Sequence, residues 1–133
     1  MAHWLLKSEP GDWSWADQVE NQVCEWDGVR NAQALGHMKE MALGDTAFFY
    51  HSGEERRIMG IVEVVRGWRE DPDDPKSGLV DVRAIEHLPR PVTLAEIKAD
   101  PAFAESPLVR QPRLSVMPVP DELWQKICEM GGL

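Results

Sequence analysis

Short apolar blocks separated by polar turns run along the whole chain. Five of them have the continuous apolar runs, the alternation or the aromatic and β-branched content that strands prefer. Gly60 interrupts the third block, and a glycine inside a strand is typical of a bend or bulge in a curling sheet. We therefore expect strands at residues 3–7, 46–51, 58–65, 80–88 and 114–117.

Four other segments place apolar side chains at helical spacing behind a residue that suits the start of a helix. Asn31 stands at the cap position of residues 31–41, ahead of Leu35, Met38 and Ala42 at i, i+3 and i+7. Residues 93–96 have the T-x-x-E spacing of a capping box. We expect helices that begin near Ser14, Asn31, Thr93 and Pro120.

Two segments are predicted to be loops. Residues 70–75 are acidic and contain two prolines, which is typical of a solvated connection, and residues 106–112 form the second loop. Strands that follow one another through short turns favour a largely antiparallel sheet. The pattern therefore predicts an α+β fold, in which a small, curled, mostly antiparallel β-barrel is flanked by short helices.

Length and composition add a single core to this picture. A chain of 133 residues that is 43% hydrophobic and 28% charged matches one globular domain, which we place at residues 1–133. Six tryptophans stand beside one tyrosine and three phenylalanines, an unusual ratio. We do not expect every tryptophan to be a core residue.

The formal net charge of −9 argues against broad, sequence-independent binding to a nucleic-acid backbone, but it leaves room for a local basic pocket. Cys24 and Cys128 have neither metal-ligand spacing nor the density of a disulfide scaffold, so two buried free thiols are expected. No stretch approaches the roughly 20 apolar residues that span a bilayer, and the start lacks a signal peptide. We expect a soluble cytoplasmic monomer that contacts no membrane, or a nuclear protein if the source is eukaryotic.

Catalytic motifs are absent from the chain. Neither G-x-S-x-G nor a phosphate-binding glycine loop occurs, and the four histidines fall in four different elements without paired cysteines. No metal site and no cofactor are therefore expected. An alternative hypothesis keeps a small hydrolase or nucleotide-processing enzyme that uses His51 with Ser52 or Ser115. A small-molecule or protein interaction module is a third hypothesis.

The stretch EWDGVRN, residues 25–31, has the chemistry of a recognition site. Trp26 offers a flat face for stacking on a base, which contributes about 1–3 kcal/mol. Asp27, Asn31 and the nearby Gln33 can read a base edge, and Arg30 can hold a phosphate. The same residues also suit a tryptophan packed in the core, an Asp-Gly turn and an arginine paired with Asp27 or Glu25. Spacing alone leaves both interpretations open.

Six segments in order resemble the EVE-domain family, which has the PUA-like fold. Together they cover nearly the whole chain, and their combination is far more specific than any one of them. They are HWLLKSEP at 3–10, EWDGVRNAQA at 25–34, LGDTAFFYHS at 43–52, GIVEVV at 60–65, VDVRAIEHLPRPVTLAEIKAD at 80–100 and PLVRQPRLSVMPV at 107–119.

This resemblance implies a partly closed barrel and a non-catalytic pocket that binds a flipped-out modified base, with modified cytosine in DNA favoured and a modified RNA base as the competing ligand. By motif, the base-binding residues are Lys7, Ser8, Trp26, Asp27, Gly28, Val29, Asn31, Phe49, Tyr50, His51, Ser52, Leu114 and Ser115, and the phosphate-binding residues are Arg30, Arg110 and Arg113. If the basic members converge, they form a local basic spot on an acidic protein.

Overall fold

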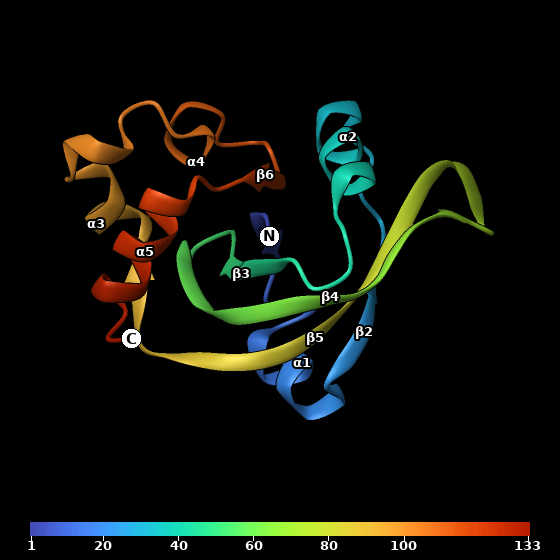
Figure 1. Ribbon diagram of the computed structural model, residues 1–133, viewed down its shortest axis with the longest axis horizontal. Coiled ribbons are helices and arrows are strands. Elements are labelled where there is room, and N and C mark those ends of the chain that lie inside the picture. Colours follow the sequence, from blue (N-terminus) through green and yellow to red (C-terminus); the bar gives the residue numbers. More distant parts are fainter.

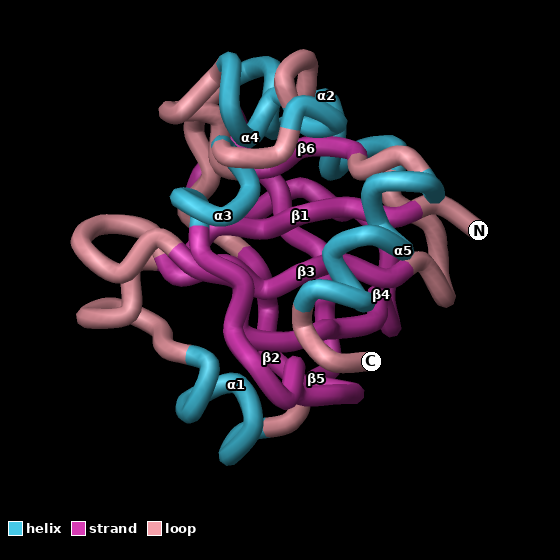
Figure 2. Tube along the Cα trace, turned by 90° about the vertical axis from the view of Figure 1, so that its left-hand side faces the viewer, coloured by secondary structure: helices cyan, strands magenta, loops and turns pink.

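The computed structural model describes residues 1–133 as one curved sheet surrounded by short helices (Figures 1 and 2). The strands are β1 (His3–Ser8), β2 (Val23–Trp26), β3 (Thr46–His51), β4 (Arg57–Asp71), β5 (Asp74–Thr93) and β6 (Val116–Pro118). The helices are α1 (Trp15–Asn21), α2 (Ala32–Glu40), α3 (Leu94–Lys98), α4 (Pro107–Arg110) and α5 (Asp121–Met130), with a 3-10 turn η1 at Pro101–Phe103.

The six strands follow the order β2-β5-β4-β3-β1-β6 in one sheet. Every neighbouring pair is antiparallel except β1 and β3, which run parallel from His3 opposite Thr46 to Ser8 opposite His51. Parallel neighbours need a crossover, and here α1, β2 and α2 supply it. The α+β class and the mostly antiparallel sheet are confirmed. The sheet is not closed, however, because β2 and β6 remain as its two edges, so the barrel was only a loose description.

Strands β4 and β5 extend well beyond their predicted limits. They pair as far as Asp71 opposite Asp74, and only Pro72 and Asp73 lie outside them, so the prediction of a loop at 70–75 was wrong. The end of this hairpin projects from the body of the molecule (Figure 1), where its charged residues can face solvent. Local rules that treat proline and aspartate as strand breakers therefore failed at this tip.

Three elements were missed, namely β2, η1 and α4, and each is only three or four residues long. Strand β2 is four residues long, too short for a periodic pattern, and exists because it pairs with Val80–Arg83 of β5. Helix α4 falls in the predicted loop 106–112, where the Ser106 hydroxyl accepts a hydrogen bond from the Leu108 N–H. Strand β6 begins at Val116, two residues later than expected.

The predicted helix caps are confirmed. Ser14 and Asp17 form a reciprocal capping box at α1, and Thr93 and Glu96 form another at α3. The Asn31 carboxamide oxygen accepts from the Ala34 N–H at 2.9 Å and begins α2. These caps depend on residues within one turn, which is why the sequence predicted them.

The core lies between the curved sheet and the helices. Helix α2 packs on β4, β5 and β6, whereas α1, α3 and α5 contact β5. The irregularity expected at Gly60 is present, because the register of β4 shifts between Ile58 and Gly60. A Cβ at Gly60 would also lie 2.3 Å from the Trp15 indole. Four of the six tryptophans are buried, namely Trp4, Trp15, Trp26 and Trp124, and the other two are half-buried.

Both cysteines are free, as expected, but each is half-buried rather than fully buried. None of the helices has the length and hydrophobicity to cross a bilayer.

Candidate functional site

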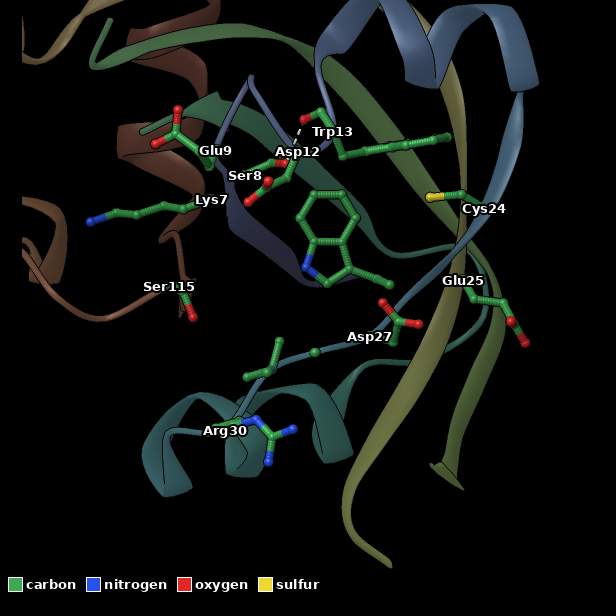
Figure 3. A pocket seen from close by; sticks show the side chains of 13 residues that line it. Lys7, Ser8, Glu9, Asp12, Trp13, Cys24, Glu25, Asp27, Arg30 and Ser115 are labelled. Atoms are coloured by element: carbon green, nitrogen blue, oxygen red, sulfur yellow. Dashed lines mark hydrogen bonds between the residues drawn. The ribbon is translucent and has the colours of Figure 1, made fainter. Parts of the chain in front are cut away.

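A cavity of about 590 Å³ opens where the end of β1, strand β2 and the loop before α2 meet (Figure 3). Its volume lies within the range typical of small-ligand sites. Its walls are formed by Lys7, Ser8, Glu9, Asp12, Trp13, Cys24, Glu25, Trp26, Asp27, Gly28, Val29, Arg30 and Ser115.

The loop that follows Trp26 is fixed by its backbone and by the β4–β5 hairpin. Gly28 adopts a φ of +73°, a left-handed conformation that glycine takes without steric cost. The buried Ser77 hydroxyl donates to the Val29 carbonyl at 2.8 Å, and the Arg30 guanidinium bonds Asp74 at 3.0 Å. The hairpin therefore holds one wall of the cavity in place.

Trp26 belongs to both the core and the cavity. Only 7% of the residue is exposed, and its ring meets Phe49 edge to face at a centroid distance of 5.5 Å. It also lines the cavity. The two interpretations of EWDGVRN that the sequence left open are thus compatible for this residue. Arg30 of this stretch, however, pairs with Asp74 rather than with Asp27 or Glu25.

Trp13 provides a second indole on the same cavity, held by a buried amide. Its Nε1 donates to the Oε1 of Gln18 at 3.0 Å, and the Cys24 thiol donates to the same oxygen at 3.0 Å. The Gln18 Nε2 donates to the Gln22 carbonyl, so this fully buried side chain uses both ends. Figure 3 shows Trp13 and Cys24 pointing toward each other across the cavity wall.

The Cys24 thiol is neutral at physiological pH. Burial raises its pKa to about 11. A protonated thiol is a poor nucleophile and suits the donor role that the geometry gives it.

Carboxylates outnumber cations around the cavity. The acids are Glu9, Asp12, Glu25 and Asp27, and the bases are Lys7 and Arg30. Figure 3 shows Asp27 turning its carboxylate toward the middle of the cavity, whereas Glu25 points away. The basic residues of the family motifs do not all converge on the cavity. Lys7 and Arg30 line it, whereas His51, Arg110 and Arg113 do not.

Lys7 is partly withdrawn from solvent at the rim. Its Nζ donates to the Pro112 carbonyl at 2.9 Å and lies 5.5 Å from the centre of the Tyr50 ring. Burial lowers the pKa of this ammonium. The ammonium therefore ties the cavity to the segment before β6.

Half of the predicted site residues line the cavity. Those brought together are Lys7, Ser8, Trp26, Asp27, Gly28, Val29, Arg30 and Ser115. Asn31, Leu114 and Arg113 line a neighbouring groove instead. Phe49 and Tyr50 are buried in the sheet behind the cavity wall, and Arg110 forms an exposed ion pair with Glu105 at 2.6 Å. Ser52 does not line the cavity and is joined to Ser8 by a backbone hydrogen bond, from the Ser52 N–H to the Ser8 carbonyl.

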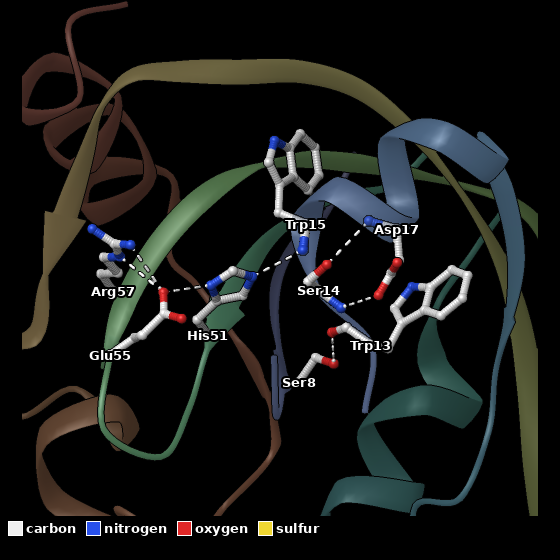
Figure 4. A network of polar contacts seen from close by, with 8 residues as sticks. All are labelled: Ser8, Trp13, Ser14, Trp15, Asp17, His51, Glu55 and Arg57. Atoms are coloured by element: carbon white, nitrogen blue, oxygen red, sulfur yellow. Dashed lines mark hydrogen bonds and ion pairs between the residues drawn. The ribbon is translucent and has the colours of Figure 1, made fainter. Parts of the chain in front are cut away.

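His51 does not line the cavity and lies in a polar network beside it, which includes the cavity residues Ser8 and Trp13 (Figure 4). Its Nε2 accepts from the Trp15 backbone N–H at 2.9 Å, so the ring proton sits on Nδ1 and is donated to Glu55 at 2.9 Å. That hydrogen bond holds the pKa of Glu55 below its usual range, and Arg57 bonds the same carboxylate. With both nitrogens engaged, His51 forms no nucleophile–base pair with Ser52 or Ser115.

Five cavity residues were missed by sequence reasoning, namely Glu9, Asp12, Trp13, Cys24 and Glu25. Glu9 directly follows Lys7 and Ser8, which was a signal in the sequence. Cys24 and Glu25 are the residues before Trp26, and recognising β2 would have brought them in. Trp13 and Asp12 lie in the turn after β1, and only the tertiary fold brings that turn to β2.

Comparison with known proteins places this geometry in a family. The model of the EVE domain matches residues 2–130. The crystal structure of protein Atu2648 from Agrobacterium tumefaciens is 45% identical and superposes with a TM-score of 0.94, covering 100% of this chain and 94% of that one.

The human relatives have the same fold. Human THYN1 protein, solved in complex with DNA that contains 5-methylcytosine, is 29% identical with a TM-score of 0.89 over 100% of this chain and 99% of that one. Human thymocyte nuclear protein 1 is 35% identical over 127 residues, which covers 74% of this chain and 56% of the relative. The chain thus spans little more than half the length of this curated relative. With a family match over nearly its full length, the chain belongs to the EVE-domain family.

Proposed function

We propose that this EVE domain is a non-catalytic reader that binds a flipped-out modified cytosine of DNA in the cavity lined by Trp13 and Trp26. The observation that carries the proposal is one cavity with two indoles and a carboxylate turned inward. The related human THYN1 protein in complex with 5-methylcytosine DNA supports it.

The energies are compatible with base flipping. Taking a base out of a stack costs a few kcal/mol, and stacking on an aromatic side chain returns about 1–3 kcal/mol. Trp26 is held edge to face by Phe49 and Trp13 by Gln18, so little side-chain entropy is lost when a base stacks on either. Two fixed indoles can therefore offset most of the cost.

Asp27 favours cytosine over thymine. A carboxylate accepts a hydrogen bond from the exocyclic N4 amine of cytosine, whereas thymine presents the O4 acceptor at that position and would meet a second negative group. Both bases can carry a 5-methyl group, so the amine distinguishes them. The Asp27 carboxylate then discriminates cytosine from thymine, and stacking on the indoles supplies the affinity.

Three DNA oligonucleotides that differ at one position, with cytosine, 5-methylcytosine or thymine, test the proposal by titration. We expect the tightest binding for 5-methylcytosine and the weakest for thymine. The same sequence made as RNA tests the competing ligand. Equal and weak binding to all of these strands would refute the reader function, and turnover of any nucleoside would instead favour the enzyme hypothesis.

Asp27→Asn provides the matched test of the carboxylate. The amide keeps the size of the side chain but presents an N–H donor as well as an acceptor, so discrimination between methylcytosine and thymine should narrow by roughly 1–3 kcal/mol. Glu25→Gln is the control, because Glu25 also lines the cavity but turns its carboxylate away from it, toward an ion pair with Arg69. An equal effect of both changes would contradict the role of Asp27.

A further inference from the structure

A second groove adjoins the cavity and has a different chemistry. Its walls are Asn31, Gln33, Gln111, Pro112, Arg113 and Leu114. The two hollows meet at Arg30 and Asn31 on one side and at Leu114 and Ser115 on the other, since one member of each adjacent pair lines each hollow. A strand that enters the cavity with one base can therefore continue into the groove.

The groove contains no carboxylate, in contrast to the cavity. Arg113 is exposed and has no ion-pair partner in the protein, unlike Arg30 and Arg110. The Lys7 ammonium reaches the groove wall through its bond to the Pro112 carbonyl. On a chain with a net charge of −9, this groove is a local place where a phosphate meets cations and no acid.

Two free amides complete the groove. The side chains of Gln33 and Gln111 are exposed and make no hydrogen bond within the protein. A glutamine amide has both a donor and an acceptor, and it pairs with the edge of a base, adenine above all. Such side chains can therefore distinguish neighbouring bases.

We propose that the groove binds the nucleotide next to the flipped base, with its phosphate on Arg113 and its base edge against Gln33 and Gln111. This inference rests on the proposed function, and it adds a sequence context to the recognition of the modified base. The cavity selects the base, and the groove selects its neighbour.

The phosphate half is tested by the salt dependence of binding to a methylated DNA oligonucleotide. Arg113→Gln should weaken binding to methylated and unmethylated strands in the same proportion and reduce the salt slope by about one. The affinity for free 5-methyldeoxycytidine, which has no phosphate, should not change. Arg83→Gln is the control for net charge, because Arg83 pairs with Glu63 on the sheet. A slope unchanged by Arg113→Gln would overturn the proposal.

The base half is tested with methylated strands in which the nucleotide on each side of the modified cytosine is varied through all four bases. We expect the wild type to prefer one neighbour by about fivefold or more. The double change Gln33→Ala and Gln111→Ala should flatten that preference. A wild type with no neighbour preference, or a preference that survives the double change, would overturn the proposal.

Failure of this inference can be separated from failure of the reader function. If methylcytosine is preferred as a free nucleoside and in strands, while the Arg113 and glutamine variants behave as the wild type, only the groove proposal fails. If neither nucleoside nor strand shows a preference for methylcytosine, the reader function itself fails, and the groove proposal with it.

Discussion

The cavity around Trp26 and the network around His51 make an instructive pair. Both contain residues from the family motifs, and both have a tryptophan beside polar side chains. In the network, Trp15 and Glu55 use both ring nitrogens of His51. In the cavity, the Asp27 carboxylate is bonded to no other side chain and faces open space. Free hydrogen-bonding capacity, rather than motif membership, separates a candidate site from a structural support.

His51→Ala should have the largest effect, a loss of stability with no change in base recognition. Removing the buried ring leaves the Trp15 N–H without a partner, takes one hydrogen bond from the Glu55 carboxylate, which keeps Arg57, and creates a cavity. We therefore expect a loss of roughly 2–4 kcal/mol in the free energy of unfolding. Chemical denaturation measures this loss. The ratio of affinities for methylated and unmethylated DNA should stay as in the wild type. A stable variant that has lost this ratio would place His51 in the site.

The Cys24 thiol should resist alkylation at neutral pH. With a pKa raised to about 11, only about one thiol in ten thousand is ionised at pH 7. The rate should rise about tenfold per pH step until the pH passes the pKa. Rates are measured by mass spectrometry in a Cys128→Ser background, so that only Cys24 is counted. Rapid labelling at pH 7 would contradict the burial that raises the pKa of this thiol.

Trp13→Ala should weaken binding to methylated DNA by about 1–3 kcal/mol. Trp68→Ala is the matched control, because Trp68 is also half-buried but covers Gly78 of β5 rather than the cavity. Titrations of both variants against one methylated oligonucleotide give the comparison. Equal losses in the two variants would mean that Trp13 acts through stability alone. Trp26→Ala is less informative, since the buried position of Trp26 couples binding to folding.

Asp74→Asn is expected to have the smallest effect. It releases Arg30, whose side chain is 80% exposed, from an ion pair with a carboxylate on the hairpin. Exposed pairs contribute less than about 1 kcal/mol, so DNA affinity should rise only severalfold at low salt and return to the wild-type value at high salt. Binding isotherms at two salt concentrations check it. A loss of affinity would instead mean that the pair holds the cavity wall in its binding shape.

Apart from the short helix α4, whose Ser106 cap is local, the sequence predicted what depends on near neighbours and missed what depends on distant partners. Ser14, Asn31 and Thr93 bond within one helical turn, so their caps were predictable. Strand β2 pairs with β5, and no local sequence pattern predicts it. The hairpin at residues 71–74 continues because its strands pair with each other, although its composition is that of a loop.

The same distinction holds for the site. Residues 26–30 were predicted because they are consecutive, and all of them line the cavity. Phe49, Tyr50 and His51 were grouped with them by motif, but the sheet buries these side chains. Trp13 was missed because a turn and a helix separate it from Trp26 along the chain, although the two meet on one cavity.

The crossover between the parallel strands β1 and β3 has a consequence for how ligand preference can change. Ten of the thirteen cavity residues lie within residues 9–30, on this single excursion of the chain. The strands at the centre of the sheet contribute little to the walls. A family could therefore acquire a new ligand by exchanging one continuous segment, and a protein engineer could transplant residues 9–30 between relatives as a cassette.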